Sequence, residues 1–303
     1  MKPSALRTDV RFATGMLVLL AALHFTPGAH AQDAKTLHAR HSELHDRLAS
    51  NPFQRPLVLE STQTDGKLKG DVYAIVAQPF SVVGPALQGM DHWCDVLMLH
   101  LNVKDCRARG SGADSMLRLA VGRKFDQPLT QAYRVDFAYR VGTSSSEYLE
   151  VRLDAAVGPL GTTDYRVVFQ AVPVDAKHSF VHMSYSYTYG TAARLAMQTY
   201  LATIGRDKVG FSVEGLRPDG TPVYIGSMRG VVERNTMRYF LAIEAYLGAT
   251  HLPAADQPEK RLQDWFAAVE RYPRQLHEMD REDYLAMKRK ELALLRTALP
   301  EGS

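Results

Sequence analysis

The feature that most constrains the fold of this chain is a series of short alternating segments between Val103 and Tyr189. In the clearest of them, Ala132 to Val141, apolar side chains at every second position alternate with charged or small ones. Successive side chains of a β-strand point to opposite faces, so such a segment has one buried and one solvated face. Turns rich in glycine, serine or proline separate the segments at short intervals. The series therefore predicts an antiparallel meander.

Helices are predicted on both sides of this meander, which places the chain in the α+β class. A hairpin of Leu57–Ser61 and Val72–Val76 precedes the meander, and two short helices follow that hairpin. After the meander come a helix between Gly190 and Gly205 and a longer one from about Gly230 to Leu247. Both of these later helices have apolar faces, and the sequence leaves open which of them covers the sheet.

The first 31 residues have the pattern of a secretory signal peptide. Lys2, Arg7 and Arg11 form a basic start, Phe12–Phe25 is apolar, and Ala29–Ala31 provides the small residues of a cleavage site. The apolar run is too short to span a membrane, and no later run is long enough. We therefore expect cleavage after Ala31 and a periplasmic or secreted protein that does not span the membrane.

Four regions are predicted along the chain. They are the signal peptide (1–31), an N-terminal helix and linker (32–56), the main α+β domain (57–252) and a helical C-terminal extension (253–303). A basic run in the extension, Lys288–Lys290, is predicted to be a solvated helix face.

The net charge argues against nucleic-acid binding. The chain has 36 lysines and arginines against 33 aspartates and glutamates. The signal carries three bases and one acid, so its removal lowers the net charge from +3 to about +1. Electrostatic binding of nucleic acid needs a basic surface, which a nearly neutral protein lacks.

Cys94 and Cys106 are the only cysteines, and both lie in the exported part of the chain. Disulfides persist outside the cytoplasm, and a bridge between these residues would close a short loop. We predict this disulfide, with two buried thiols as the alternative.

Sequence patterns of enzymes and metal sites are weak in this chain. No G-x-S-x-G sequence occurs, and the densest acid–histidine cluster, His92, Asp95 and His100, fits capping or packing roles better than metal binding. An enzyme would need His182 to meet Asp136 or Glu150 inside a cavity. We predict no catalytic, metal-binding or cofactor-binding residue.

The order of elements resembles that of the START-like (SRPBCC) superfamily of helix-grip proteins. The local likeness is VYAIVAQPFSVVGPALQGMDHWCDVL, residues 72 to 97, in which a strand, a Pro-Phe turn and a tryptophan-bearing second helix follow one another. The resemblance covers about Leu68 to Leu247. It implies an antiparallel sheet wrapped on a helix, with an apolar cavity between them for a lipid-like or polycyclic ligand. The fold hosts both carriers and enzymes.

The residues predicted to line this cavity share one property, an aromatic or flexible apolar side chain on a predicted inner face. They are Tyr133, Phe137, Tyr139, Met183, Tyr185, Tyr187, Tyr189, Met197 and Tyr200. Tyrosines in such a cavity would stack on apolar surface and donate hydrogen bonds to a ligand. The alternative is that they form core, or the outer face of the sheet.

Three functional hypotheses follow. The first is an exported periplasmic protein that binds or shuttles a hydrophobic small molecule or lipid. The second is an enzyme on the same scaffold, such as a cyclase, isomerase or hydrolase. The third is an envelope interaction or assembly factor that uses the extension from Pro253 as its docking surface.

Overall fold

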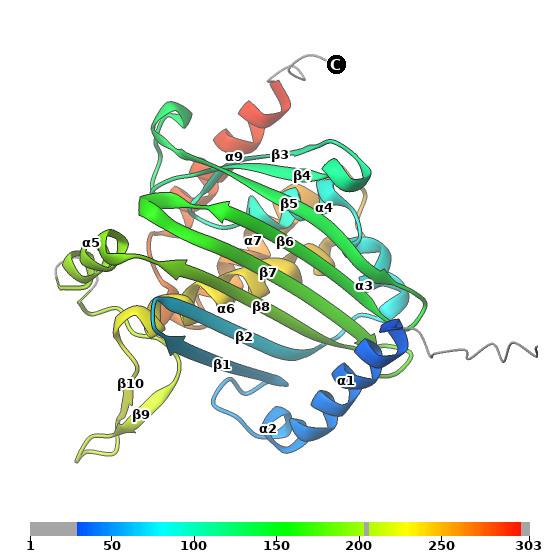
Figure 1. The fold of residues 1–303 in the computed structure, drawn as a ribbon, viewed down its shortest axis with the longest axis horizontal. Helices are drawn as coiled ribbons and strands as arrows, with labels where there is room; N and C mark the ends of the chain where they lie inside the picture. Colours follow the sequence, from blue (N-terminus) through cyan, green and yellow to red (C-terminus); the bar gives the residue numbers. More distant parts are fainter. Residues whose placement is uncertain (1–28, 203–205, 298–303) are drawn as a thin grey trace, which may run out of the picture.

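A computed structural model describes residues 29–202 and 206–297, so almost all of the predicted signal peptide lies outside the described residues. Its centre is an eight-stranded antiparallel sheet in the order β1-β2-β8-β7-β6-β5-β4-β3 (Figure 1). The strands are β1 (Leu57–Thr64), β2 (Lys67–Val76), β3 (Val103–Arg109), β4 (Met116–Val121), β5 (Tyr133–Ser144), β6 (Leu149–Val157), β7 (Thr162–Pro173) and β8 (Ser179–Tyr189). The predicted meander is therefore confirmed as strands β3 to β8.

The first hairpin, β1 and β2, extends the sheet beyond β8, the last strand of the meander. β1 pairs with β2, and β2 pairs with β8, so that Leu68 faces Tyr187 across the ladder. Two short helices, α3 (Phe80–Leu87) and α4 (Met90–Leu97), carry the chain from β2 to β3 at the opposite edge. The Cys94–Cys106 disulfide, with an S–S distance of 1.97 Å, joins α4 to β3 and confirms the predicted pairing.

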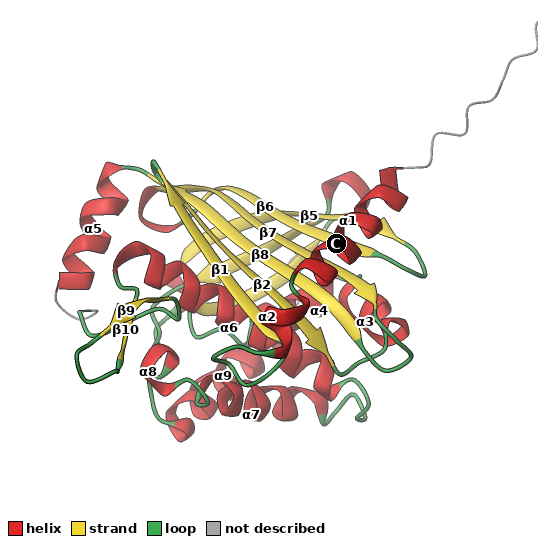
Figure 2. Cartoon of the chain, turned by 90° about the horizontal axis from the view of Figure 1, so that it is seen from below, coloured by secondary structure: helices red, strands yellow, loops and turns green. Residues whose placement is uncertain are grey.

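The helix that covers the sheet is α6 (Ser227–Ala249), the longer of the two predicted candidates (Figure 2). Most of its residues are buried. It approaches β2 so closely that a Cβ atom on Gly70 would lie 2.2 Å from Thr236 Oγ1, a contact that only glycine permits. The result is a helix-grip fold, with the curved sheet wrapped on α6.

The other predicted candidate, α5 (Thr191–Ala202), follows β8 directly and lies beyond the end of the sheet (Figures 1 and 2). Leu195 on this helix is 65% exposed, so α5 is not a lid over the inner face. A two-stranded hairpin, β9 (Val213–Leu216) and β10 (Pro222–Tyr224), separates α5 from α6.

The C-terminal extension is a further layer of the same core. It contains α7 (Gln257–Val269), α8 (Pro273–Leu276) and α9 (Arg281–Thr297). Trp265 stacks on Tyr284 at 5.0 Å and donates to the Arg238 carbonyl of α6 at 3.1 Å. Because its apolar face is buried, the extension is not a free docking element.

The basic run of α9 was predicted to be solvated, and for Lys288 this is wrong. Lys288 is fully buried; its Nζ donates to the Val103 carbonyl and lies 2.7 Å from Glu291. Glu291 also pairs with the buried Lys104 of β3 at 3.0 Å. These contacts fix α9 across the β3 edge of the sheet.

The N-terminal helices cover part of the outer face. These helices are α1 (Ala29–Glu43) and α2 (His45–Ala49). They contribute three leucines to a second apolar cluster: Leu37 of α1, Leu44 between the helices and Leu48 of α2. This cluster includes Phe180 and Tyr148 from the outer face of the sheet. No helix in the described part of the chain is both long and apolar enough to cross a membrane.

Candidate functional site

The predicted aromatic strand lies on the inner face of the sheet, in the core. Tyr185 and Tyr187 are buried and stand 5.6 Å apart, and Tyr187 stacks on Tyr165 at 5.2 Å. Tyr185 also meets Tyr239 of α6 at 5.3 Å. Burial raises the pKa of Tyr185 well above its usual value. The rings contact one another and α6.

The other predicted lining residues have different positions. Phe137, Tyr139, Met183 and Tyr189 are buried on the inner face, and Met197 packs against the edge of the core. The Tyr139 hydroxyl donates to the Gln88 carbonyl at 2.5 Å, and the Tyr189 hydroxyl accepts from Gln63 at 2.9 Å. The side chain of Tyr200 lies outside the described residues.

Tyr133 does not belong to this buried set. It begins β5 and is 50% exposed, so its predicted place in an interior cavity is wrong. The alternation of β5 assigns it to the inner face, but the side chain at this first position of the strand is half exposed.

The polar pair proposed for an enzyme does not form. His182 lies on the outer face, where Nε2 is 2.8 Å from Asp71 and Nδ1 is 2.8 Å from Gln170. Asp136 instead pairs with Arg118 at 3.0 Å, and Glu150 accepts from Gln170 at 2.9 Å. Both ring nitrogens of His182 therefore have polar partners on the outer face, away from the inner face where the predicted cavity would lie.

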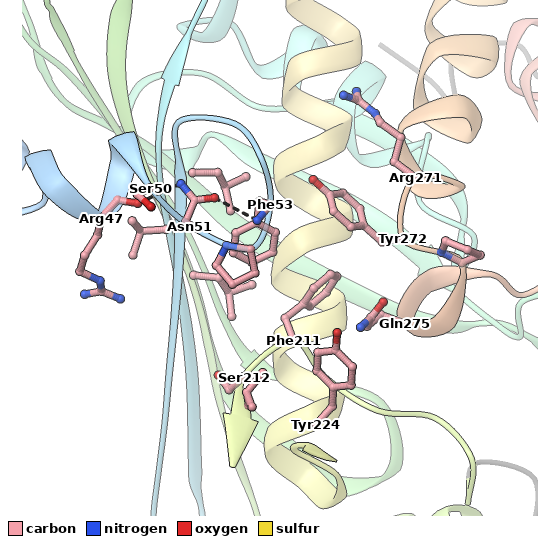
Figure 3. Close-up of a pocket in the computed structure, with 16 residues that line it drawn as sticks. Arg47, Ser50, Asn51, Phe53, Phe211, Ser212, Tyr224, Arg271, Tyr272 and Gln275 are labelled. Atoms are coloured by element: carbon pink, nitrogen blue, oxygen red, sulfur yellow. Dashed lines mark hydrogen bonds between the residues drawn. The ribbon is translucent and has the colours of Figure 1, made fainter. Parts of the chain in front are cut away.

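A pocket of about 450 Å³ lies instead beside the outer edge of β1 (Figure 3). Its walls come from the α2–β1 loop, from β1, from the β9–β10 region and from the α7–α8 junction. The lining residues are Arg47, Ser50, Asn51, Pro52, Phe53, Leu57, Val58, Leu59, Phe211, Ser212, Val213, Tyr224, Arg271, Tyr272, Pro273 and Gln275. None of the predicted lining residues is among them.

Three aromatic rings in mutual contact form one wall of the pocket. Phe53 lies 5.6 Å from Phe211 and 6.0 Å from Tyr272, and Phe211 lies 5.5 Å from Tyr272. Asn51 fixes the loop that carries Phe53. Its Oδ1 accepts from the Phe53 amide at 3.0 Å, and its Nδ2 donates to the Arg55 carbonyl at 2.8 Å. The wall is therefore held by backbone contacts as well as by ring packing.

A buried carboxylate, Glu233 of α6, holds the segment that carries Phe211. It accepts hydrogen bonds from the amides of Phe211 at 2.6 Å and Ser212 at 2.9 Å. It also accepts from the hydroxyls of Ser212 and of Ser61 in β1, both at 2.6 Å. A Cβ on Gly210 would lie 2.5 Å from this carboxylate, so glycine is required beside it.

The edge of β1 presents backbone groups on the side of the pocket. The Ile75 amide donates to the Pro56 carbonyl at 3.0 Å, which makes residues 56 and 75 a hydrogen-bonded pair. In an antiparallel ladder such pairs alternate, so the amide and carbonyl of Leu59 point away from β2. Leu59 lines the pocket, where these groups are available to a ligand.

Gln275 is the buried polar side chain of the pocket. It is only 7% exposed, and its side-chain amide has no hydrogen-bond partner among the residues that the structure describes. Figure 3 shows the amide directed toward the Phe211 and Tyr224 side of the pocket. The amide nitrogen and oxygen are open to the pocket, where water or a polar ligand atom can form hydrogen bonds with them.

Periodicity could not reveal this pocket, because its residues come from four separate segments with no shared spacing. A weaker signal was present in the sequence. Phe53 and Tyr272 both stand next to a proline in stretches predicted as linker or helix end. Large aromatic residues in connecting segments need a surface on which to pack, and here they pack on each other.

The topology is that of a helix-grip fold, an antiparallel sheet wrapped on a long helix. The strand pair that joins β8, the two short helices and the long closing helix occur in the order that the sequence resemblance implied. α5, the β9–β10 hairpin and the three C-terminal helices are additions to that plan.

No protein-family model matches the sequence, and no curated protein is similar to it. Solved structures to which the chain is similar include a conserved protein from Geobacillus kaustophilus, with 10% identity, a TM-score of 0.35, and coverage of 59% of this chain and 95% of that one. An aromatase/cyclase from Streptomyces has 11% identity and a TM-score of 0.33, with coverage of 68% and 94%. A START superfamily protein from Mycobacterium smegmatis has 14% identity and a TM-score of 0.30, with coverage of 50% and 92%. Similarity of this size carries no statement about activity.

Proposed function

We propose that this chain is an exported, periplasmic protein that binds a hydrophobic small molecule or lipid in the pocket beside β1. The observation that carries the proposal is a recess of about 450 Å³ with a wall of three touching aromatic rings and, facing it, the Gln275 amide, which has no protein partner among the described residues. Ligand sites combine apolar surface with polar groups that fix the ligand's orientation, and this pocket presents both, with polar and apolar side chains in similar share.

The volume limits the size of the ligand. Pockets for small molecules are commonly roughly 300–1,000 Å³, so this one lies in the lower half of that range. It suits one drug-sized molecule or a single acyl chain better than a lipid with two chains. The sheet–helix interface is a poorer place for the ligand, because the tyrosines there are occupied by contacts with each other.

Two features support export. The sequence begins with a basic, then apolar, then small-residue pattern. The disulfide between Cys94 and Cys106 is of a kind that persists in oxidising compartments. Cell fractionation followed by intact-mass measurement tests this part: the protein should be in the periplasm and its chain should begin at Gln32. A full-length cytoplasmic chain would refute export.

Native mass spectrometry of the exported protein, purified without detergent, tests ligand binding. The expected result is a bound apolar compound that is released on denaturation. A Val213→Trp variant should lose it, because Val213 lines the pocket and the larger ring fills the space. Val223→Trp on the paired strand is the matched control, since Val223 is similarly exposed but does not line the pocket.

Comparison of the compound bound by the Val213→Trp and Val223→Trp variants tests whether the ligand occupies this pocket. Loss of the compound in both variants, or in neither, would remove the pocket from the proposal. Absence of any bound compound, together with failure of added amphiphiles to bind, would refute the function.

A further inference from the structure

The charged residues around the pocket indicate the charge of its ligand, an inference that rests on the proposed function. The lining residues include Arg47 and Arg271 but no aspartate or glutamate. Arg47 is neutralised by Glu60 at 2.5 Å. Arg271 is exposed and has no ion-pair partner within residues 29–202 and 206–297. The uncompensated positive charge of the pocket is therefore at Arg271.

A second cation reinforces this charge. The guanidinium of Arg274 lies 4.9 Å from the ring centre of Tyr224, a pocket-lining residue, and Arg274 is exposed without a carboxylate partner in the described chain. Two acids of α6 contact the segments that form the pocket: Glu233 accepts four hydrogen bonds from neutral donors, and one carboxylate oxygen of Glu244 pairs with Arg55. The rim therefore favours a negatively charged group on the ligand.

Inside the pocket, the Gln275 amide favours an uncharged polar group on the ligand rather than an anion. The Gln275 amide offers one acceptor and two donor positions, and it carries no charge. It faces a lining of mixed polar and apolar side chains and lacks a protein partner among the described residues. A neutral hydroxyl or carbonyl oxygen satisfies such an amide, whereas a second charge placed there would lose its hydration without an opposite charge beside it.

We propose that the ligand is an anionic amphiphile recognised at two points. Its oxyanion, a carboxylate or a phosphate monoester, lies at Arg271 on the rim. Its apolar body packs on Phe53, Phe211 and Tyr272, and a neutral oxygen substituent pairs with Gln275.

Calorimetric titration of the exported, full-length mature protein with ligands of equal chain length tests the first point. Dodecanoate and dodecyl phosphate are each expected to bind about tenfold more tightly than dodecanol, the effect of one charge-assisted hydrogen-bonded pair. The stronger of the two anions identifies the head group. Raising the salt concentration should weaken binding of the anions and leave that of dodecanol unchanged.

Arg271→Gln should reduce the anion preference to about twofold or less, and Arg281→Gln is the matched control because Arg281 is an exposed arginine outside the pocket. Arg271 follows the C-terminal end of α7, where a cation also favours the helix dipole. Thermal melts of both variants therefore accompany the titrations, and affinities are compared at a temperature at which both are folded.

The second point is tested by 12-hydroxydodecanoate, which is expected to bind about fivefold more tightly than dodecanoate to the natural protein. In Gln275→Met, of nearly equal side-chain size, this advantage should disappear while dodecanoate still binds. Equal binding of dodecanoate and dodecanol, or an unchanged anion preference in Arg271→Gln, would overturn the inference and leave the proposed function intact. Failure of every amphiphile to bind would instead refute the proposed function.

Discussion

Replacement of Glu278 by glutamine tests how the C-terminal extension is held on the domain. Glu278 lies between α8 and α9 and is nearly buried. Its carboxylate accepts from Lys124 at 2.5 Å and from Arg238 at 2.6 Å, and Lys208 lies 3.5 Å away. Three cations from three different parts of the chain thus depend on one acid.

The stability that the Glu278 charge contributes follows from the change in its pKa on folding. Burial alone would raise the pKa of Glu278, but Arg238, Lys124 and Lys208 outweigh it and lower the pKa from 4.5 to about 2. At about 1.4 kcal/mol for each tenfold change in proton affinity, the charged form gains about 3 kcal/mol on folding. Removal of one partner from a buried ion pair commonly costs about 3–5 kcal/mol, which agrees. We therefore expect Glu278→Gln to lower the free energy of unfolding by about 3 kcal/mol.

Urea unfolding of the full mature chain at pH 7, followed by circular dichroism, measures this loss. Glu282→Gln is the control, because Glu282 is exposed and its nearest cation, Arg281, is 3.6 Å away. This control should change stability by less than about 0.5 kcal/mol.

The pH dependence provides an independent check on Glu278. A carboxylate with a lowered folded-state pKa contributes stability that is present above pH 4.5 and is lost as the pH falls toward about 2. Glu278→Gln should lack this part of the acid destabilisation. A loss below about 1 kcal/mol at pH 7, or an acid profile identical to that of the natural protein, would refute the electrostatic account.

Two further predictions concern the packing of the core. Burial lowers the pKa of Lys288 from 10.5 to about 8, despite the nearby Glu291. Between about pH 8 and 10.5 the unfolded chain therefore binds more protons at Lys288 than the folded chain, so the free energy of unfolding should rise with pH. Lys288→Met should flatten this rise, as measured by urea unfolding at several pH values. An equally steep rise in the variant would contradict the prediction. Gly70→Ala places a methyl group 2.2 Å from Thr236 Oγ1 and should cost about 1–3 kcal/mol or more in thermal unfolding. Gly215→Ala, with no atom within 4 Å of the added group, should have almost no such cost; equal costs would refute the steric argument.

Much of the sheet could be predicted because alternation along a strand directly reports which side chains are buried. β5 follows this pattern closely, and β4 and β6 follow it in part, whereas β8 is buried along almost its whole length and β1 is buried at one end only. Alternation does not report where the cover over a face ends, which is why Tyr133 was assigned to the interior. Nor does an amphipathic helix identify its partner surface, so the packing of α1 on the outer face was not foreseen.

The pocket and the buried Lys288 needed information that local sequence does not contain. A lysine between Met287 and Arg289 has the composition of a solvated face, and only the placement of Glu291 beside the β3 edge makes its burial tolerable. The lining of the pocket depends on loops brought together by the packing of α6 against β1 and α7. The inner-face tyrosines were correctly placed on a buried face, but the aromatic character that suggested a ligand cavity serves packing there.

The hydrogen bonds of Glu233 have a consequence for the thermodynamics of ligand entry. This carboxylate ties β1 and the Phe211 segment to α6, most of whose residues are buried, so contacts within the protein hold the pocket wall in place before any ligand arrives. A preorganised wall loses little conformational entropy on complex formation, so more of the contact energy is retained as affinity. Association should then need only side-chain adjustment at the rim, with the backbone of the pocket unchanged between the free and the occupied protein.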